Sequence, residues 1–205
     1  VELNGKTMIE HVVDACQQTE HRVCVVTDDI RIHKKVMNKC MSFFDPSEHP
    51  NGTARVASKI KDAWLKKYDN IVNVQGDMPD VTPEMIEKCI AQLEHYPVTT
   101  VFTEMPKEKQ DDPNTVKMIR AGDQALWFGR GMTGYGDWHL GVYGYRRNAL
   151  KMYSTLEVTP EEEIEQLEQL RWLKNGWQIG CYRVNFKGVE INTPEDVQEW
   201  EKINT

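Results

Sequence analysis

A short apolar segment in the first half of the chain runs directly into residues that suit phosphate chemistry. Residues 71–74 are followed by Gln75-Gly76-Asp77, where the glycine lets the backbone approach a ligand. A carboxylate at that place is what a hard cation bound to phosphates requires, because Mg²⁺ usually takes one or two carboxylates plus substrate oxygens and water. Asp77 is therefore a candidate Mg²⁺ ligand, with a plain turn as the alternative interpretation.

Polar residues also follow other apolar segments. Thr27-Asp28-Asp29 comes after one of them, and Asn192 precedes the last predicted helix, with Glu190 two residues earlier. Ligands of α/β proteins bind at the carboxyl ends of strands, so both places are candidate sites. For Asp28 and Asp29 a helix cap is the favoured interpretation.

Two further segments are candidates for binding. His49-Pro50-Asn51-Gly52-Thr53 ends at the start of a predicted helix, where free N–H groups and the helix dipole can hold an anion or a base edge. On its own this segment is only a turn. His139 lies between Trp138 and an apolar strand, and a histidine satisfied within the core is the favoured interpretation of that residue alone.

The elements that must position these residues alternate between strand and helix over the first half of the chain. Apolar residues at helical spacing predict helices over residues 7–16, 31–39, 54–65 and 83–95, the third with Val56, Ala57, Ile60, Ala63 and Trp64 facing inward. Apolar segments predict strands over residues 22–27, 41–44, 71–74 and 98–104. Such alternation predicts an α/β fold with a mostly parallel sheet and helices on both faces.

The pattern changes after Pro106. Short strands over 116–119, 125–128 and 141–145 predict a small antiparallel extension at about 106–147. A helix is predicted over 162–174, with Ile164, Leu167, Leu170 and Leu173 on its apolar face, and Thr193-Pro194 begins the last helix. We expect a single domain over residues 1–205.

Composition excludes several classes of protein. The chain has 205 residues and a formal net charge of −7, and its scattered basic residues do not form the patch that nucleic acid requires. Its apolar runs are far shorter than the roughly 18 residues of a membrane span. The five cysteines follow no metal or disulfide spacing, so we expect reduced cysteines in a cytoplasmic protein.

Eight short motifs occur together in a characteristic order and resemble the CMP-KDO synthetases, the 3-deoxy-manno-octulosonate (KDO) cytidylyltransferases. They are Asn4-Gly5-Lys6-Thr7-Met8-Ile9-Glu10-His11, Val26-Thr27-Asp28, Gly52-Thr53-Ala54-Arg55, Asn73-Val74-Gln75-Gly76-Asp77, Pro113-Asn114-Thr115-Val116-Lys117, His139-Leu140-Gly141-Val142-Tyr143-Gly144-Tyr145-Arg146, Leu167-Glu168-Gln169-Leu170-Arg171 and Asn192-Thr193-Pro194-Glu195-Asp196. The resemblance runs from about Asn4 to the C-terminus.

The resemblance implies a nucleotidyltransferase-type fold, a homodimer and Mg²⁺-dependent transfer of CMP from CTP to the anomeric hydroxyl of KDO. It implies that Asp77 binds the metal and Gln75 helps to hold the sugar acid. The residues implied to lie along the cytidine are Asn51, Gly52, Thr53 and Arg55, and those implied on the sugar side are His139, Tyr143, Tyr145, Glu168 and Gln169, with Arg146 or a helix end as a partner for the sugar carboxylate.

The sequence also departs from the family pattern. The family's first strand and its basic, glycine-containing phosphate loop are expected upstream of Val1, and a chain without them is expected to fold and bind CTP poorly. The second metal carboxylate of the family aligns with the neutral Asn192, and Glu190 is the alternative ligand. Activation of a nonulosonate-type sugar acid, or binding without turnover by a degenerate relative, are the alternative functions.

Overall fold

The computed structural model describes residues 1–204, which fall into two compact units that are each built from separate stretches of chain. The first unit comprises Val1–Pro50, Val74–Glu84 and the chain from Lys187 onward, and the second comprises Asn51–Asn73 and Met85–Phe186. The expected single domain stays a prediction. Neither unit corresponds to a continuous half of the sequence.

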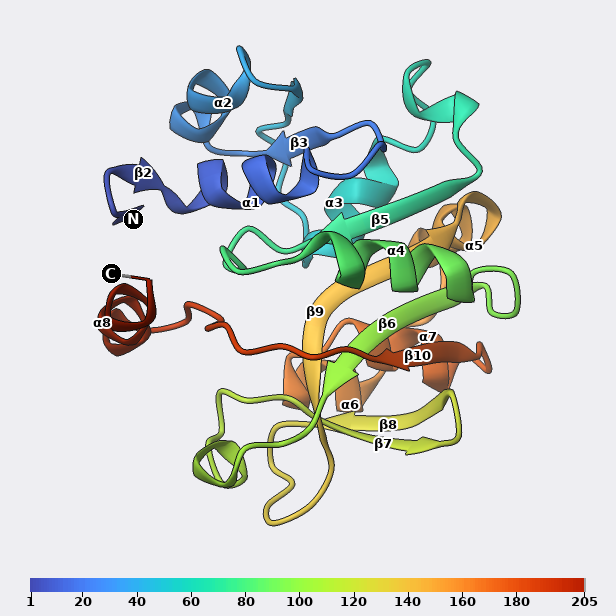
Figure 1. Cartoon of the computed structure of the whole chain (residues 1–205). Helices are drawn as coiled ribbons and strands as arrows, with labels where there is room; N and C mark the ends of the chain where they lie inside the picture. The colour runs from blue at the N-terminus through green and yellow to red at the C-terminus, as the bar shows by residue number, and fades with distance from the viewer. Residues whose placement is uncertain (205) are drawn as a thin grey trace. The chain divides into compact units, whose positions relative to one another are not determined.

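The first unit pairs short strands with three helices (Figure 1). Its elements are β1 (Glu2–Leu3), β2 (Lys6–Thr7), α1 (Met8–Cys16), β3 (Cys24–Thr27), α2 (Ile30–Val36), β4 (Met41–Phe44) and α8 (Pro194–Ile203). Strands β3 and β4 are parallel, as a βαβ unit requires. Asn4 and Gly5 both have positive φ and close the β1–β2 hairpin, a turn that Asn-Gly favours.

The second unit contains a six-stranded sheet in the order β5-β9-β6-β10-β8-β7. Its strands are β5 (Asn70–Val74, which ends in the first unit), β6 (Val98–Thr103), β7 (Lys117–Ala121), β8 (Gln124–Gly129), β9 (Asp137–Arg146) and β10 (Ile179–Arg183). Its α-helices are α3 (Gly52–Ser58), α4 (Pro83–Gln92, which begins in the first unit), α5 (Arg147–Met152), α6 (Pro160–Glu165) and α7 (Gln169–Lys174). Short 3₁₀ turns occupy Leu65–Lys67, Lys107–Lys109 and Tyr153–Thr155.

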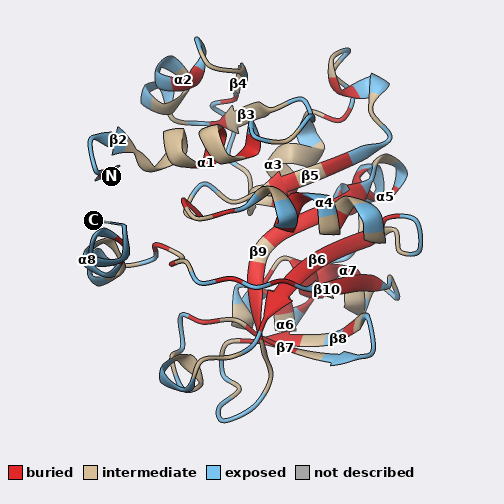
Figure 2. Cartoon of the chain, viewed as in Figure 1, coloured by how far each residue is buried: buried red, intermediate tan, exposed pale blue. Residues whose placement is uncertain are grey.

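The α/β class and the cover of helices on both faces are confirmed. Helix α4 lies in front of the sheet in Figure 1 and α7 behind it, and Figure 2 shows β6, β9 and β10 as largely buried between them. The sheet itself is mixed rather than mostly parallel, because β10 runs parallel to β6 but β9 is antiparallel to it. The expected antiparallel extension is present as β7, β8 and the start of β9.

Three predicted helices are shorter than expected. Helix α2 ends at Val36 rather than at residue 39, α3 covers 52–58 instead of 54–65, and α4 ends at Gln92 rather than at residue 95. Ile60 is buried as predicted, whereas Ala63 is exposed. The predicted helix was too long because apolar residues continue at helical spacing beyond its true end. Ile60 reaches the core from a loop, so its burial does not require the helix to continue.

The helix predicted over 162–174 is broken. Gln166 has φ 55° and ψ 45°, a left-handed conformation that ends α6. The predicted apolar face is wrong at Ile164, which is 79% exposed, although Leu167 and Leu170 are buried in the core. The break leaves Glu162 on one helix and Glu168 at the start of the next, and both carboxylates are used by the site described below.

Candidate active site

In the first unit the predicted metal residues lie on two adjoining stretches of chain. Asp77 follows the end of β5, and its backbone carbonyl accepts a hydrogen bond from the Ile191 N–H at 3.0 Å. This contact brings the stretch that carries Glu190 and Asn192 alongside Asp77. Glu190 is half-buried and Asn192 is exposed. The structure therefore places the three predicted ligands on neighbouring backbone, and their role as metal ligands stays a prediction.

The donor chemistry of this region is that of oxygen ligands. Within residues 1–204 no group of three or more histidine, cysteine, aspartate or glutamate side chains is arranged to hold a metal. A cation here would thus take at most the two carboxylates of Asp77 and Glu190, the Asn192 amide oxygen and oxygens from its ligand. That set fits Mg²⁺, which is commonly held by one or two carboxylates plus substrate phosphates.

The Asp29 carboxylate is used within its own helix. The Asp29 side chain accepts a hydrogen bond from the Arg31 N–H at 2.7 Å and caps α2. The helix-cap interpretation is therefore confirmed for Asp29.

In the second unit the Asn51-Gly52-Thr53 turn is held by buried side chains from distant parts of the chain. The Asn51 side chain caps α3 through the Ala54 N–H, and its Nδ2 donates to the Tyr153 hydroxyl at 2.9 Å. The Thr53 N–H donates to Glu168 at 2.8 Å, and the Thr53 hydroxyl lies 2.7 Å from that of Tyr145. Such a turn is fixed before any ligand arrives.

A buried ion pair supports this turn from behind. Arg171 donates to both oxygens of Glu162, at 2.8 and 2.6 Å, and its guanidinium lies 4.4 Å from the centre of the Tyr153 ring. Burial raises the pKa of the Glu168 carboxyl, while hydrogen bonds from Thr53 oppose that rise. Burial also raises the pKa of the Tyr145 hydroxyl well above its usual value. The Tyr145 hydroxyl therefore acts as a neutral hydrogen-bonding group.

His139 lies within the core of the second unit. It is 3% exposed, its ring contacts Phe128, and its Nε2 lies 2.9 Å from the Thr100 hydroxyl. Thr100 donates its proton to the Val142 carbonyl at 2.8 Å, so Nε2 of His139 must be the donor in the remaining bond. Burial lowers the pKa of His139 to about 3, with the charge of Arg130 adding to the effect. The favoured interpretation, a satisfied core histidine, is thus confirmed.

The other sugar-side candidates extend from the same region. Tyr143 and Tyr145 stack with ring centroids 6.2 Å apart, and both are buried. Gln169 is 2% exposed, yet its Nε2 has no hydrogen-bond partner among the described residues. A buried amide donor without an acceptor is costly, and it is explained when a ligand supplies the acceptor.

The remaining predicted site residues lie on or next to helices, and one of them has a partner other than the expected one. Gly52 opens α3 and Arg55 lies in its last turn, both half-buried. Arg146, the expected partner for a sugar carboxylate, instead donates to the Leu93 and Glu94 carbonyls at the end of α4. Sequence analysis missed Glu162 and Tyr153. Nothing local to Tyr153 indicates its partner, which lies 102 residues away in the chain.

Similarity to solved structures first defines the class of fold. The chain matches a CMP:2-keto-3-deoxy-manno-octonic acid synthetase complexed with CTP, with a TM-score of 0.89 and 28% identity over 100% of this chain and 90% of that one. A 4-diphosphocytidyl-2C-methyl-D-erythritol synthase from Anaerococcus prevotii matches in fold alone, with a TM-score of 0.68 at 14% identity over 100% of this chain and 91% of that one. The fold is of the nucleotidyltransferase type.

The chain belongs to the cytidylyltransferase family, whose model matches residues 1–179. It is 34% identical to an 8-amino-3,8-dideoxy-manno-octulosonate cytidylyltransferase of Shewanella sp. (strain ANA-3), over 98% of this chain and 89% of that protein. It is 33% identical to a 3-deoxy-manno-octulosonate cytidylyltransferase of Fusobacterium nucleatum, over 96% of this chain and 86% of that protein. Among the described residues no helix is long and apolar enough to cross a membrane.

Proposed function

We propose that this protein transfers CMP from CTP to the anomeric hydroxyl of a 3-deoxy-octulosonate sugar acid and releases pyrophosphate. The observation that carries the proposal is the likeness, in sequence and in fold and over nearly the whole chain, to proteins named for this reaction. Both KDO and its 8-amino analogue occur in the names of those relatives.

The sugar-side residues support a polyhydroxylated acid as the acceptor. Gln169 has a buried amide donor that awaits an acceptor, and the stacked Tyr143 and Tyr145 lie in the same unit. Hydroxyl-rich ligands need several hydrogen-bonding groups on a rigid frame, because an ordered frame reduces the entropy lost on binding. Gln169 would contact the sugar, and the tyrosines would shape its surroundings.

The nucleotide side is proposed to use the preformed turn. The Asn51 side chain bonds to Tyr153 and the Thr53 hydroxyl lies against that of Tyr145, and we place cytidine along the backbone around Gly52 and beside the half-buried Arg55. A glycine here lets the base approach the backbone closely.

The metal is proposed to be Mg²⁺, held by Asp77 with Glu190 and Asn192. Bound there, Mg²⁺ would supply positive charge next to the phosphate oxygens. The chain's own task is to hold these oxygen donors, the nucleotide turn and the sugar groups in place. A homodimer and a cytoplasmic location remain predictions.

The reaction itself exchanges one phosphorus–oxygen bond for another. The anomeric oxygen forms a bond to the α-phosphorus as the bond from that phosphorus to the pyrophosphate oxygen breaks, and the hydroxyl proton is released. Little covalent chemistry falls to the protein, so positioning and charge neutralisation supply the rate enhancement.

Pyrophosphate release measured with CTP, Mg²⁺ and three acids tests this proposal. We expect turnover with KDO or its 8-amino analogue, and much slower turnover with N-acetylneuraminate. Equal turnover with N-acetylneuraminate would contradict an octulosonate specificity. CTP binding by calorimetry without turnover on any acid would instead indicate a non-catalytic relative.

A further inference from the structure

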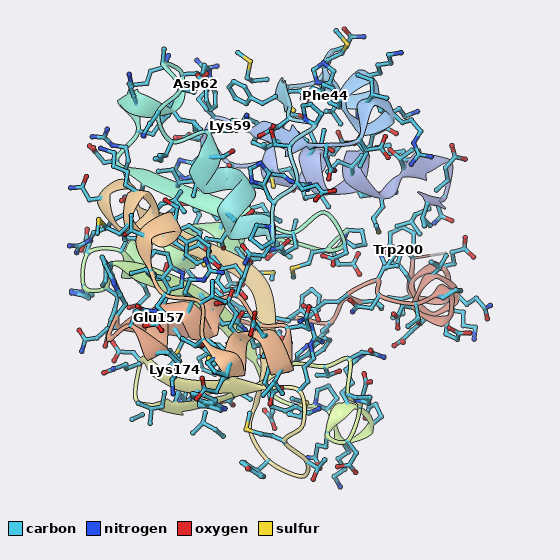
Figure 3. The ribbon with its side chains drawn as sticks, turned by 180° about the vertical axis from the view of Figure 1, so that it is seen from behind. Phe44, Lys59, Asp62, Glu157, Lys174 and Trp200 are labelled. Carbon is cyan, nitrogen blue, oxygen red and sulfur yellow. The ribbon has the colours of Figure 1, made fainter. Side chains whose placement is uncertain are left out.

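Asp80, three residues after Asp77, joins two distant parts of the first unit. One carboxylate oxygen accepts the Val189 N–H at 2.9 Å, and the other accepts the indole N–H of Trp200 at 2.7 Å. Trp200 lies on α8 (Figure 3) and is 4% exposed. A single half-buried carboxylate therefore ties the loop after β5 both to the 187–193 stretch and to the last helix.

The 187–193 stretch depends on such ties because it lies outside every strand of the described chain. Its N–H groups are held one by one. Val189 donates to the Asp80 side chain, Ile191 donates to the Asp77 carbonyl, and Asn192 and Thr193 both donate to the Asp196 side chain. The placement of Glu190 and Asn192 is thus set by side-chain contacts and the Ile191–Asp77 backbone bond rather than by the ladder of a strand.

The backbone of Gly188 packs closely against Asp80. A Cβ added at Gly188 would lie 2.3 Å from the Asp80 Cβ, so no side chain fits at that position while Asp80 stays where it is. On the other side, Trp200 packs in an apolar cluster with Leu3, Val189 and Ile191. Asp80 is therefore held between a glycine backbone and a buried indole.

We propose that Asp80 is a positioning residue for the oxygen donors of this unit. Its two hydrogen bonds fix the register of 187–193 against the loop after β5, so that Glu190 and Asn192 stay beside Asp77. Both of its oxygens accept hydrogen bonds from protein N–H groups, so we assign Asp80 to positioning rather than to substrate contact. This inference rests on the proposed function, since it assigns a role relative to the proposed metal ligands.

The proposal can be tested by replacing one carboxylate oxygen of Asp80 with an NH₂ group. An aspartate accepts from two N–H groups in different directions, whereas an asparagine has one accepting oxygen and one donating NH₂ group. In Asp80→Asn, one of the two partners, Val189 or Trp200, must therefore face a donor. Trp200→Phe removes the indole N–H together with part of the buried ring and leaves the Asp80 carboxylate in place.

The experiment compares wild type, Asp80→Asn, Trp200→Phe and Asp14→Asn in the full chain. Asp14 is the matched control, because it is an aspartate of the same unit that pairs only with Lys6 and Lys39. Mn²⁺ affinity in the presence of CTP is measured by electron paramagnetic resonance, kcat and KM by pyrophosphate release, and exchange of the Ile191 amide by NMR.

We expect Asp80→Asn to weaken Mn²⁺ binding and to lower kcat, each by roughly 10- to 100-fold, the range for residues that orient metal ligands. Exchange of the Ile191 amide should accelerate, and the KM for the sugar acid should change little. Trp200→Phe should shift the same quantities in the same direction by less, and Asp14→Asn should match wild type.

Unchanged Mn²⁺ affinity and kcat in a folded Asp80→Asn protein would overturn the proposal, whatever happens to its melting temperature. If that variant does not fold, wild-type Mn²⁺ affinity in Trp200→Phe overturns it and weakened affinity supports it. Failure of the proposed function is a different result, in which the wild-type protein itself neither binds CTP nor releases pyrophosphate.

Discussion

Carboxylates of the two units are placed in contrasting surroundings. In the second unit Glu162 is 7% exposed and forms an ion pair with Arg171, and Glu168 accepts a hydrogen bond from the Thr53 N–H. Both carboxylates therefore have structural roles. In the first unit Asp77 and Glu190 are half-buried on backbone that lies outside the strands. Within the second unit, buried carboxylates hold a turn in place, whereas within the first unit the proposed oxygen donors remain near water.

The contrast predicts that residues of the first unit affect turnover more than stability. Asp77→Asn keeps the side-chain shape but removes the charge of the proposed metal ligand. We expect turnover to fall by about two to three orders of magnitude or more, as when a pre-organised charge-stabilising group is lost. The melting temperature should be unchanged. Retained activity in a stable variant would reduce Asp77 to a turn residue.

Residues of the second unit should show the opposite behaviour. Arg171→Met leaves the Glu162 carboxylate buried without its partner, which costs about 3–5 kcal/mol of unfolding free energy. Lys174→Met is the matched control, because Lys174 (labelled in Figure 3) pairs with Glu161 at 2.6 Å on the surface of the same helix pair. Its cost should be at most about 1 kcal/mol. If urea denaturation showed equal losses of unfolding free energy in Arg171→Met and Lys174→Met, the expected difference between the buried and the exposed ion pair would be contradicted.

Gln169 sharpens the comparison, because it is a buried residue of the second unit that is proposed to contact the sugar. Gln169→Leu removes a buried donor that has no partner among the described residues, so the free energy of unfolding should stay equal or rise. Sugar binding should weaken by about 1–3 kcal/mol, seen as a higher KM for the sugar acid at constant KM for CTP. A destabilised variant with normal KM would show that the amide has a structural partner.

The core histidine of the second unit predicts a pH dependence of the unfolding free energy. The pKa of His139 is about 3 when folded, against 6.5 when exposed, so the unfolded state binds the extra proton. The stabilisation is complete above pH 6.5 and is lost as the pH falls toward 3. At pH 5 the loss amounts to about 2 kcal/mol relative to pH 8. Denaturation of His139→Asn should show a shallower dependence over that range; identical slopes would contradict it.

The smallest expected effect concerns Asn192. Asn192→Asp adds a charge beside Asp77, so Mn²⁺ binding with CTP should tighten, by less than about tenfold because the side chain is exposed and water screens it. The same Mn²⁺ titration of Glu190→Gln tests whether Glu190 is a ligand. No gain in the first variant with a large loss in the second would show that Glu190 has replaced residue 192 as the ligand.

Much of the fold and part of the site followed from local chemistry. Thr7 with Glu10, and Thr193 with Asp196, form the capping boxes that begin α1 and α8, and Thr159-Pro160 begins α6. The order of motifs predicted the family, and the carboxylate after β5 lies where it was expected. These features act within a few residues of one another, so a sequence displays them directly.

The sequence by itself determined the alternation of strands and helices in the first half of the chain, the starts of α1, α4 and α8, and the set of polar residues available for chemistry. Only the tertiary structure decided how they are used. The break at Gln166, the Thr53–Glu168 bond across 115 residues and the Asp80–Trp200 bond across 120 residues arise between distant segments. A buried polar group must find its partner wherever the packed chain supplies one, and that requirement overrides the local preference of a continuous helix or a regular strand.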